Sequence, residues 1–442
     1  MLDVKQNAKD NLKYMLDGIR YICEHYKNRS PGSESERGAQ DYFKKELGKY
    51  ADTVISEDFN VHPGAFFGFI PPAAIFSLLS IVFYWIGAKY GNGFLVAAVV
   101  LMLIAVLMFI FEFLFYRSFV DFLFPKKVSR NVYAVRKSEE QATRRIIFCG
   151  HADAVNEWRY SYMGEIKTLG PVMAGGVIGM LYVFGVNVAY FIRVLTNGYA
   201  PVPIEGVWKV LGIIMFVFVP FLIAIIFFIN YKIIVDGAND NMTACYISIA
   251  VLKILQEKNI RFKNTEVGCL IAGSEEAGIR GSRAFARKHK EELKEIETVT
   301  IAMDTQREIE ALAIYTIGCT GTSHADEAVG DLIHEAGVNC GIDMPRADLY
   351  PGAIDSDAFA QEGLMAAGFC GVNHNPKRYY HTREDTADNL NPECIQLSLE
   401  ICLEALKLYD EKGGIQNWKK QKKKKKVLTN ANRCDILMKP QG

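Results

Sequence analysis

The sequence predicts an α/β fold with a mainly parallel central sheet flanked by helices, interrupted by two transmembrane helical hairpins. Two observations lead to this prediction. Short apolar strand segments alternate with helical segments over most of the chain, and four long apolar runs interrupt that alternation. Strands that alternate with helices are typical of parallel sheets covered by helices. The formal net charge is zero over 442 residues, so charge gives no reason to expect nucleic acid as a partner.

The four apolar runs predict helices that cross a lipid bilayer. Half of the residues are apolar, and the mean hydropathy of +0.07 is high for a water-soluble enzyme. Each run is near the roughly 20 residues that span a bilayer as a helix. A buried core helix is the alternative, but these runs are apolar all round rather than along one face. The runs are Phe66–Ile86, Phe94–Tyr116, Pro171–Ile192 and Val210–Ile229.

The remaining chain, about 300 residues, suits one large α/β domain formed by segments that are discontinuous in the sequence. Strands are expected from Val54 and at Asn131–Arg136, Arg145–Cys149, Thr265–Ala272 and Val299–Met303. Helices are expected around Met15–Cys23, at 36–50, at Met242–Gln256, from Gly281 and at Pro392–Glu411. We therefore assign 1–62, 126–165 and 233–416 to the soluble domain, 63–125 and 166–232 to the two hairpins, and 417–442 to a basic, disordered tail. The lysine run of that tail could alternatively be attracted to anionic lipid.

Five short polar segments stand out, each where an apolar strand ends or in a glycine-flanked loop. The carboxyl ends of parallel strands meet at one edge of a sheet, so we expect these segments to converge. The adjacent pair Glu275 and Glu276 is notable, because neighbouring carboxylates are costly unless a cation or a proton compensates them. The segments are GHAD (150–153), DGANDN (236–241), GSEEAGIRGS (273–282), AMDTQ (302–306) and YHTREDT (380–386).

Together these segments supply two histidines, two aspartates and two glutamates, the set that a two-zinc hydrolase needs. Each zinc takes about four nitrogen and oxygen ligands, one carboxylate bridges the ions, and another acts as general base on a water. Asp153 lies two residues after the first histidine, where it could orient the imidazole. The alternative is that the six residues sit apart for separate structural reasons. They are His151, Asp240, Glu275, Glu276, Asp304 and His381.

This pattern resembles the di-zinc aminopeptidase family that includes aminopeptidase Y, bacterial secreted leucyl aminopeptidases and glutamate carboxypeptidase II. All five motifs occur in the family's order, and SPGSESERGAQDYF at 30–43 resembles its amino-terminal signature. The resemblance implies a zinc-exopeptidase-like fold, two zinc ions per chain, Glu275 as general base and a cis peptide between Asp240 and Asn241. The implied metal ligands are His151 and Asp304 for the first zinc, Glu276 and His381 for the second, and Asp240 for both.

Two departures from the family pattern matter. Thr243 and Ala244 follow the bridging motif where the family commonly has Ser-Gly, and a hairpin separates His151 from Asp240. The chemistry stays plausible, but the inserted hairpins change how a substrate reaches the site.

The function expected from these observations is that of a membrane-embedded zinc exopeptidase, above all an aminopeptidase acting on peptides. Its partners are then a peptide substrate and the lipid bilayer, with no nucleic acid. Two alternatives remain open: an inactive membrane scaffold of the same fold, and a single-zinc enzyme similar to glutaminyl cyclase. The presence of both His151 and Asp304 favours two metal ions over one.

The hairpins also predict the topology and the position of the site. Two spans lie between His151 and Asp240, so both residues stay on one side of the membrane. Lysine and arginine near the spans are in excess on that side, and no signal peptide is visible, so we expect a cytoplasmic catalytic domain. Ten scattered cysteines without a CxxC pair favour buried thiols in a reducing compartment. The short segment from Ile229 to Asp240 reaches roughly 35 Å at most, which predicts an active site near the bilayer surface and substrates found there.

Three other polar residues are set apart from the site. His324 repeats the His-Ala-Asp spelling, but Thr322 or Ser323 there is expected to cap a helix that runs to His334. Asp357 in DSDAF is either structural or lines the pocket. Glu112, near the end of a membrane run, is expected to extend towards the interface.

Overall fold

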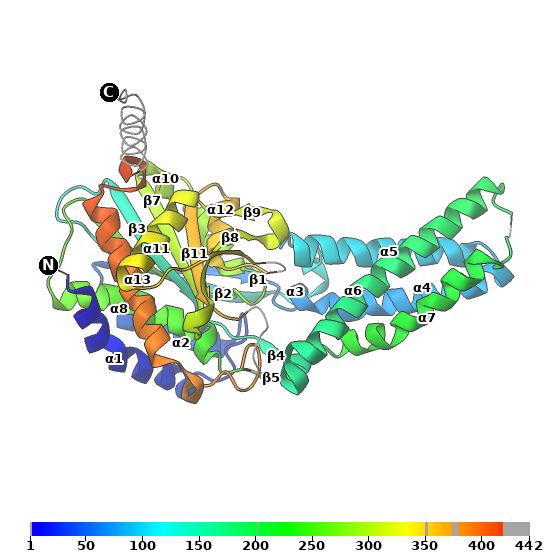
Figure 1. Cartoon of the computed structure of the whole chain (residues 1–442), viewed down its shortest axis with the longest axis horizontal. Helices are drawn as coiled ribbons and strands as arrows, with labels where there is room; N and C mark the ends of the chain where they lie inside the picture. Colours follow the sequence, from blue (N-terminus) through cyan, green and yellow to red (C-terminus); the bar gives the residue numbers. More distant parts are fainter. Residues whose placement is uncertain (1, 201, 350–351, 374–378, 419–442) are drawn as a thin grey trace, which may run out of the picture.

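The computed structural model describes residues 2–200, 202–349, 352–373 and 379–418. It consists of an α/β domain and a bundle of long helices that projects from one side of it (Figure 1). Most of the basic tail predicted at 417–442 lies outside the described residues.

The central sheet confirms the predicted fold class. Its strand order is β1-β2-β6-β3-β7-β11-β8-β10, with β9 paired to β8. The four strands β6, β3, β7 and β11 run parallel, and β1, β2 and β8 pair antiparallel with their neighbours β2, β6 and β11. The strands are β1 Thr53–Val61, β2 Lys127–Arg136, β3 Arg144–His151, β6 Thr265–Ala272, β7 Glu297–Gln306, β8 Leu312–Gly318, β9 Ser323–His324, β10 Arg346–Asp348 and β11 Met365–Gly371.

Helices bury both faces of this sheet. Ile146 and Phe148 of β3 join the core beneath α1, α8 and α13, whereas Ile147 and Cys149 join a separate core with Phe285 of α9 on the other face. This explains why the strand reads as a continuous apolar run rather than an alternating one. The helices of the domain are α1 Val4–His25, α2 Glu34–Leu47, α8 Thr243–Glu257, α9 Arg280–Lys288, α10 Glu292–Glu295, α11 Glu327–Cys340, α12 Asp355–Gln361 and α13 Pro392–Glu411.

The projecting bundle contains four helices that are long and apolar enough to cross a membrane, at 65–87, 93–114, 159–196 and 207–226. Residues on their outer faces, such as Phe216 and Val217, are exposed although they are apolar. The third helix begins at Arg159, well before the apolar run predicted from Pro171. Its first turns are polar, so they did not belong to that run, and the backbone departs from helical geometry at Gly164 and Glu165. The elements are α3 Ala65–Gly68, α4 Ile70–Tyr90, α5 Gly93–Met108 with a π turn at Phe109–Leu114, α6 Arg159–Thr196 and α7 Val207–Ile226.

Two structures join the bundle to the domain. At the second hairpin, β4 (Asn156–Trp158) and β5 (Ile229–Ile234) form an antiparallel ribbon. At the first, Glu112 is fully buried, so the expectation that it extends towards the interface is wrong. Its Oε1 lies 2.6 Å from Nη2 of Arg280 on α9, and its Oε2 accepts hydrogen bonds from two backbone N–H groups. A buried cation on the domain thus holds the carboxylate inside the protein.

We predict that Arg280→Met destabilises the protein by about 3–5 kcal/mol, because it leaves the buried Glu112 carboxylate without its cation. The matched control is Arg287→Met, whose ion pair with Glu362 on the same face is more exposed and should be worth less than about 1 kcal/mol. Chemical denaturation in mild detergent measures both changes. Equal losses for the two variants would show that the Arg280 pair does not join the hairpin to the domain.

Candidate metal centre and active site

Two groups of ligand atoms lie side by side where the strands of the sheet end, and the atoms within each group are all within 4.8 Å of one another. In the first, Nε2 of His151 is 3.2 Å from Oδ1 of Asp240 and 3.8 Å from Oδ2 of Asp304. In the second, Nε2 of His381 is 2.9 Å from Oδ2 of Asp240 and 3.6 Å from Oε1 of Glu276. Asp240 belongs to both groups, so one carboxylate lies between the two positions.

These spacings suit zinc. Tetrahedral zinc with ligands at about 2.0–2.2 Å holds its ligand atoms roughly 3.3 Å apart, and the spacings here run from 2.9 to 3.8 Å. Several buried ligand atoms also lack a hydrogen-bond partner among the described residues, including both ring nitrogens of His151, Oδ1 of Asp240 and Oε1 of Glu276. Buried polar atoms are rarely left unsatisfied, so these atoms are suited to a bound cation.

The electrostatics of the site also favour a cation. Burial raises the pKa of both Glu275 and Glu276 well above the usual range for glutamate, and neighbouring carboxylates raise it further. Burial and the charge on Asp240 likewise raise the pKa of Asp304. Burial raises the pKa of the nearby Asp355 to about 6. Such a concentration of buried acids is unfavourable unless a positive charge neutralises it.

Local backbone conformations aim these side chains. His151 ends β3, Asp304 lies near the end of β7, and Glu275 follows β6 after two residues. Non-glycine residues with positive φ occur beside the ligands at Ser274 (φ 52°) and Thr305 (φ 46°), and at His381 itself (φ 54°). Such conformations cost about 1–3 kcal/mol each and tend to gather at functional sites. The peptide between Asp240 and Asn241 is cis, as the family resemblance implies.

Buried carboxylates outside the ligand set hold the loops that carry it. Asp153 accepts hydrogen bonds from the backbone N–H groups of Glu275 (3.0 Å) and Glu276 (2.9 Å). Its Oδ1 also lies 3.5 Å from Nδ1 of His151, the ring that the sequence expects it to orient. Asp153 therefore contacts two of the motifs at once.

Two more supporting acids were not singled out from the sequence. Asp385, four residues after His381, accepts from the backbone N–H groups of Asn239 (2.7 Å) and Asp240 (3.2 Å). Glu36 accepts from the backbone N–H of Ser274 at 2.7 Å, just before the glutamate pair. Burial raises the pKa of Asp385 to about 7 and that of Glu36 to about 8. Both lie in sequence motifs that were identified as candidates. A single carboxylate in such a motif does not by itself indicate that it supports a neighbouring loop.

The remaining sequence expectations have separate outcomes. His324 lies on the short strand β9 and is exposed, and the following helix begins at Glu327 with Asp326 as its cap. The prediction that Thr322 or Ser323 caps this helix was therefore wrong, because Asp326 accepts from two N–H groups of the first turn. Asp357 accepts from the backbone N–H of Ile354 and stabilises the start of α12, which is the structural role. The described cysteines are free and mostly buried, as expected.

The ligand groups open into a cleft with a volume of about 330 Å³. Glu275, which lies 3.7 Å from Nε2 of His151, lines the cleft with the ligands. Trp158 from the base of the second hairpin stacks edge-on against His381, with ring centroids 4.2 Å apart. The opposite wall is apolar and comes largely from the hairpins: Phe66, Phe67, Phe113, Ile166, Leu169 and Met173.

Comparison with known proteins agrees with this fold. Residues 227–406 match the sequence profile of peptidase family M28. No curated protein matches the sequence. The chain is similar in structure to an aminopeptidase from Aneurinibacillus sp. strain AM-1, with a TM-score of 0.54 and 14% identity over 92% of this chain and 95% of that one.

Two other solved structures are similar to the chain. One is a zinc aminopeptidase from Bacillus subtilis, with a TM-score of 0.53 and 13% identity over 90% of this chain and 95% of that one. The other is a glutaminyl cyclase from an Acidobacteriales bacterium, with a TM-score of 0.51 and 12% identity over 91% and 95%. At these identities the likeness shows a shared fold. The chain therefore has the α/β fold of zinc exopeptidases, and its M28-like segment carries five of the six candidate metal ligands and base: Asp240, Glu275, Glu276, Asp304 and His381.

Proposed function

We propose that this protein is a membrane-embedded aminopeptidase that binds two zinc ions and uses Glu275 as its general base. The observation that carries the proposal is the pair of ligand groups that share Asp240, with the Glu275 carboxylate beside them. The match to peptidase family M28 and the fold shared with zinc aminopeptidases support the same reaction.

Two zinc ions, when bound, would supply Lewis-acid chemistry: they would polarise the scissile carbonyl and lower the pKa of the attacking water. His151 and Asp304 would hold one ion, His381 and Glu276 the other, and Asp240 both. Glu275 would take the proton from the attacking water and deliver it to the leaving amine. Asp153 would keep Glu275 in position, because it accepts the N–H group of that residue. The apolar wall would exclude bulk water and strengthen each of these interactions.

An aminopeptidase fits the cleft better than an enzyme that recognises a carboxyl terminus. Four carboxylates and one histidine line the cleft, and among its described lining residues there is no lysine or arginine. A subsite for a free carboxylate usually contains such a cation, so this lining disfavours recognition of a carboxyl terminus. We infer that the substrate's amino terminus binds beside the metal ligands.

A single-zinc transferase is the second candidate, since the fold is also shared with a glutaminyl cyclase. The presence of two complete ligand groups favours the two-zinc hydrolase. The third possibility, an inactive scaffold, is disfavoured because every ligand position and the base are filled.

The bundle supports membrane embedding. All four apolar helices project from one side of the α/β domain, so a single bilayer could accommodate them together (Figure 1). An even number of spans in each hairpin keeps the whole domain on one side. Positive residues near the spans then favour the cytoplasmic side. On the domain side they are Arg117, Lys126, Lys127, Arg130, Arg159, Lys167 and Lys232, against Lys89, Arg193 and Lys209 at the hairpin tips.

We predict that Glu275→Gln lowers kcat on amino-acyl fluorogenic substrates by about 10²–10⁴-fold and retains the metal, because the amide cannot accept the proton. Metal content and turnover are measured on the same detergent-purified sample. The control is Glu295→Gln, which changes an exposed glutamate on helix α10. This helix contributes no residue to the ligand groups, so turnover should be unchanged. Wild-type turnover in Glu275→Gln would remove this residue from the base role.

Metal analysis separates the three candidate functions. We expect two zinc ions per chain, loss of activity on chelation and recovery on addition of zinc. His381→Ala should reduce the content towards one ion, because it removes a ligand from only one group. One ion in the wild type would favour the cyclase-like enzyme, and none would favour the scaffold.

Protease accessibility in sealed vesicles of known orientation tests the topology. We expect cleavage within residues 233–416 only when the cytoplasmic face is accessible. Cleavage of the domain from outside an intact cell would contradict a cytoplasmic site.

A further inference from the structure

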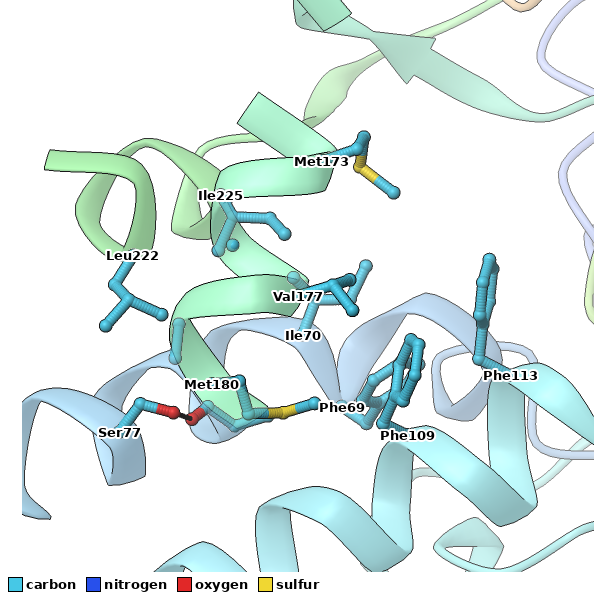
Figure 2. Close-up of a pocket in the computed structure, with 13 residues that line it drawn as sticks. Phe69, Ile70, Ser77, Phe109, Phe113, Met173, Val177, Met180, Leu222 and Ile225 are labelled. Atoms are coloured by element: carbon cyan, nitrogen blue, oxygen red, sulfur yellow. Dashed lines mark hydrogen bonds between the residues drawn. The ribbon is translucent and has the colours of Figure 1, made fainter. Parts of the chain in front are cut away.

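A half-open, almost entirely apolar cavity with a volume of about 50 Å³ lies between the bundle helices (Figure 2). All four long helices contribute to its wall, with Ala74 on α4, Phe109 at the end of α5, Val177 on α6 and Leu222 on α7. The hydroxyl of Ser77 lines the cavity too, but it donates to the backbone oxygen of Ala73 at 2.9 Å and so needs no other partner. Cavities of this chemistry stay dry and accept apolar molecules rather than water.

The cavity lies next to the active-site cleft. Phe113 and Met173 line both of them, so these two side chains are a shared boundary between the cavity and the cleft. Figure 2 shows both side chains at one end of the cavity. The lining residues come from the start of α4, the end of α5 and the turn after it, the end of α7 and the middle of α6. A linear molecule that reaches from the ligand groups past Phe113 and Met173 would thus enter the bundle.

A second pocket also reaches the ligands. It has a volume of about 180 Å³, and its lining is mixed, with Lys127, Asn156 and the metal-ligand candidate Glu276 beside Phe67 and Ile229. Glu276 lines the main cleft as well. The ligand groups are therefore reached both from the side of the bundle cavity and from this second pocket.

We propose that the substrate is a lipid-bearing amide, such as a peptide carrying a long alkyl or acyl chain, and that part of the chain lies in the bundle cavity and the rest extends through its open side, while the scissile bond lies at the ligand groups. This inference rests on the proposed peptidase function and names its substrate class. The apolar cavity matches the chain, and the second pocket gives the product without the chain a way out. A chain drawn from the bilayer would reach the site without crossing water.

The test uses full-length protein with zinc, in detergent or lipid nanodiscs, and one short peptide sequence. The peptide carries no chain or an octyl, dodecyl or hexadecyl amide at its carboxyl end. Each methylene transferred from water to an apolar site contributes about a fourfold change in affinity, so kcat/KM should rise along the series until the cavity is full. Equal kcat/KM for all four peptides would overturn the inference and leave the proposed peptidase function intact.

Cavity-filling variants show whether the bundle cavity is responsible. Val177→Phe and Ala74→Leu each add volume inside it from different helices, so one informative variant remains if the other fails to fold. Both should lower the ratio of kcat/KM for the hexadecyl peptide to that for the chain-free peptide by about 16-fold, the equivalent of two methylenes. The matched control is Ile178→Phe, which adds the same ring one residue away on the outer face, where the side chain is 55% exposed. An equal fall of the ratio in Ile178→Phe would point to general partitioning into lipid and contradict the cavity.

A crosslinking experiment tests whether the chain binds in the cavity without relying on turnover. A hexadecyl peptide with a diazirine near the end of its chain should crosslink to cavity residues such as Phe109 or Met180, and Val177→Phe should reduce that crosslinking. Crosslinks confined to the outer surface of the bundle, or a tightly bound phospholipid retained in the cavity by native mass spectrometry, would overturn the inference. If crosslinks form in the cavity but no peptide is hydrolysed, the chain-binding role stands and the proposed peptidase function fails.

Discussion

The buried negative charge where the strands of the sheet end is the constraint on which the rest of the structure depends. Glu275, Glu276, Asp240 and Asp304 converge at the wall of the cleft, and the first three are buried. Without cations this arrangement is unfavourable, because burial and mutual repulsion both oppose ionisation. The two histidines and the paired ligand geometry are the means by which the chain can hold those cations. Metal binding and folding of this edge are therefore expected to be coupled.

The loops around the site are held in place by further hydrogen bonds that keep the buried acids close together. Asp153 holds the two N–H groups of the glutamate pair, and Asp385 holds the loop that carries Asp240. Three positions with positive φ lie at or beside ligands, which is the backbone strain expected where side chains must point to one location. Because these supports link different motifs, loss of any one of them would disturb several ligands together.

The hairpins belong to this arrangement and are not simple anchors. Trp158 at the base of the second hairpin packs on His381, and the backbone N–H of Trp158 donates to the backbone oxygen of His381. Arg280, four residues after Glu276, binds Glu112 of the first hairpin. Both metal-ligand loops are thus tied to segments that enter the bundle. The hairpins form one wall of the cleft, so they limit which substrates can reach the ligands.

The sequence predicted the fold class and brought the ligand candidates together because strand ends and apolar runs are local signals. Thr265–Ala272 and Pro392–Glu411 have the expected bounds for this reason. Features that depend on tertiary contacts could not be predicted from the sequence. Glu112 resembled an interfacial residue until Arg280 was seen beside it, and the role of Asp385 depends on a loop 145 residues away. The start of α6 was missed because its first turns are polar and pack on the domain.

The most direct measurement of the central claim is anomalous scattering at the zinc edge from crystals of the full-length protein. The account predicts two peaks. One should lie between His151, Asp304 and Asp240, and the other between His381, Glu276 and Asp240. A single peak, or zinc bound away from these residues, would contradict it.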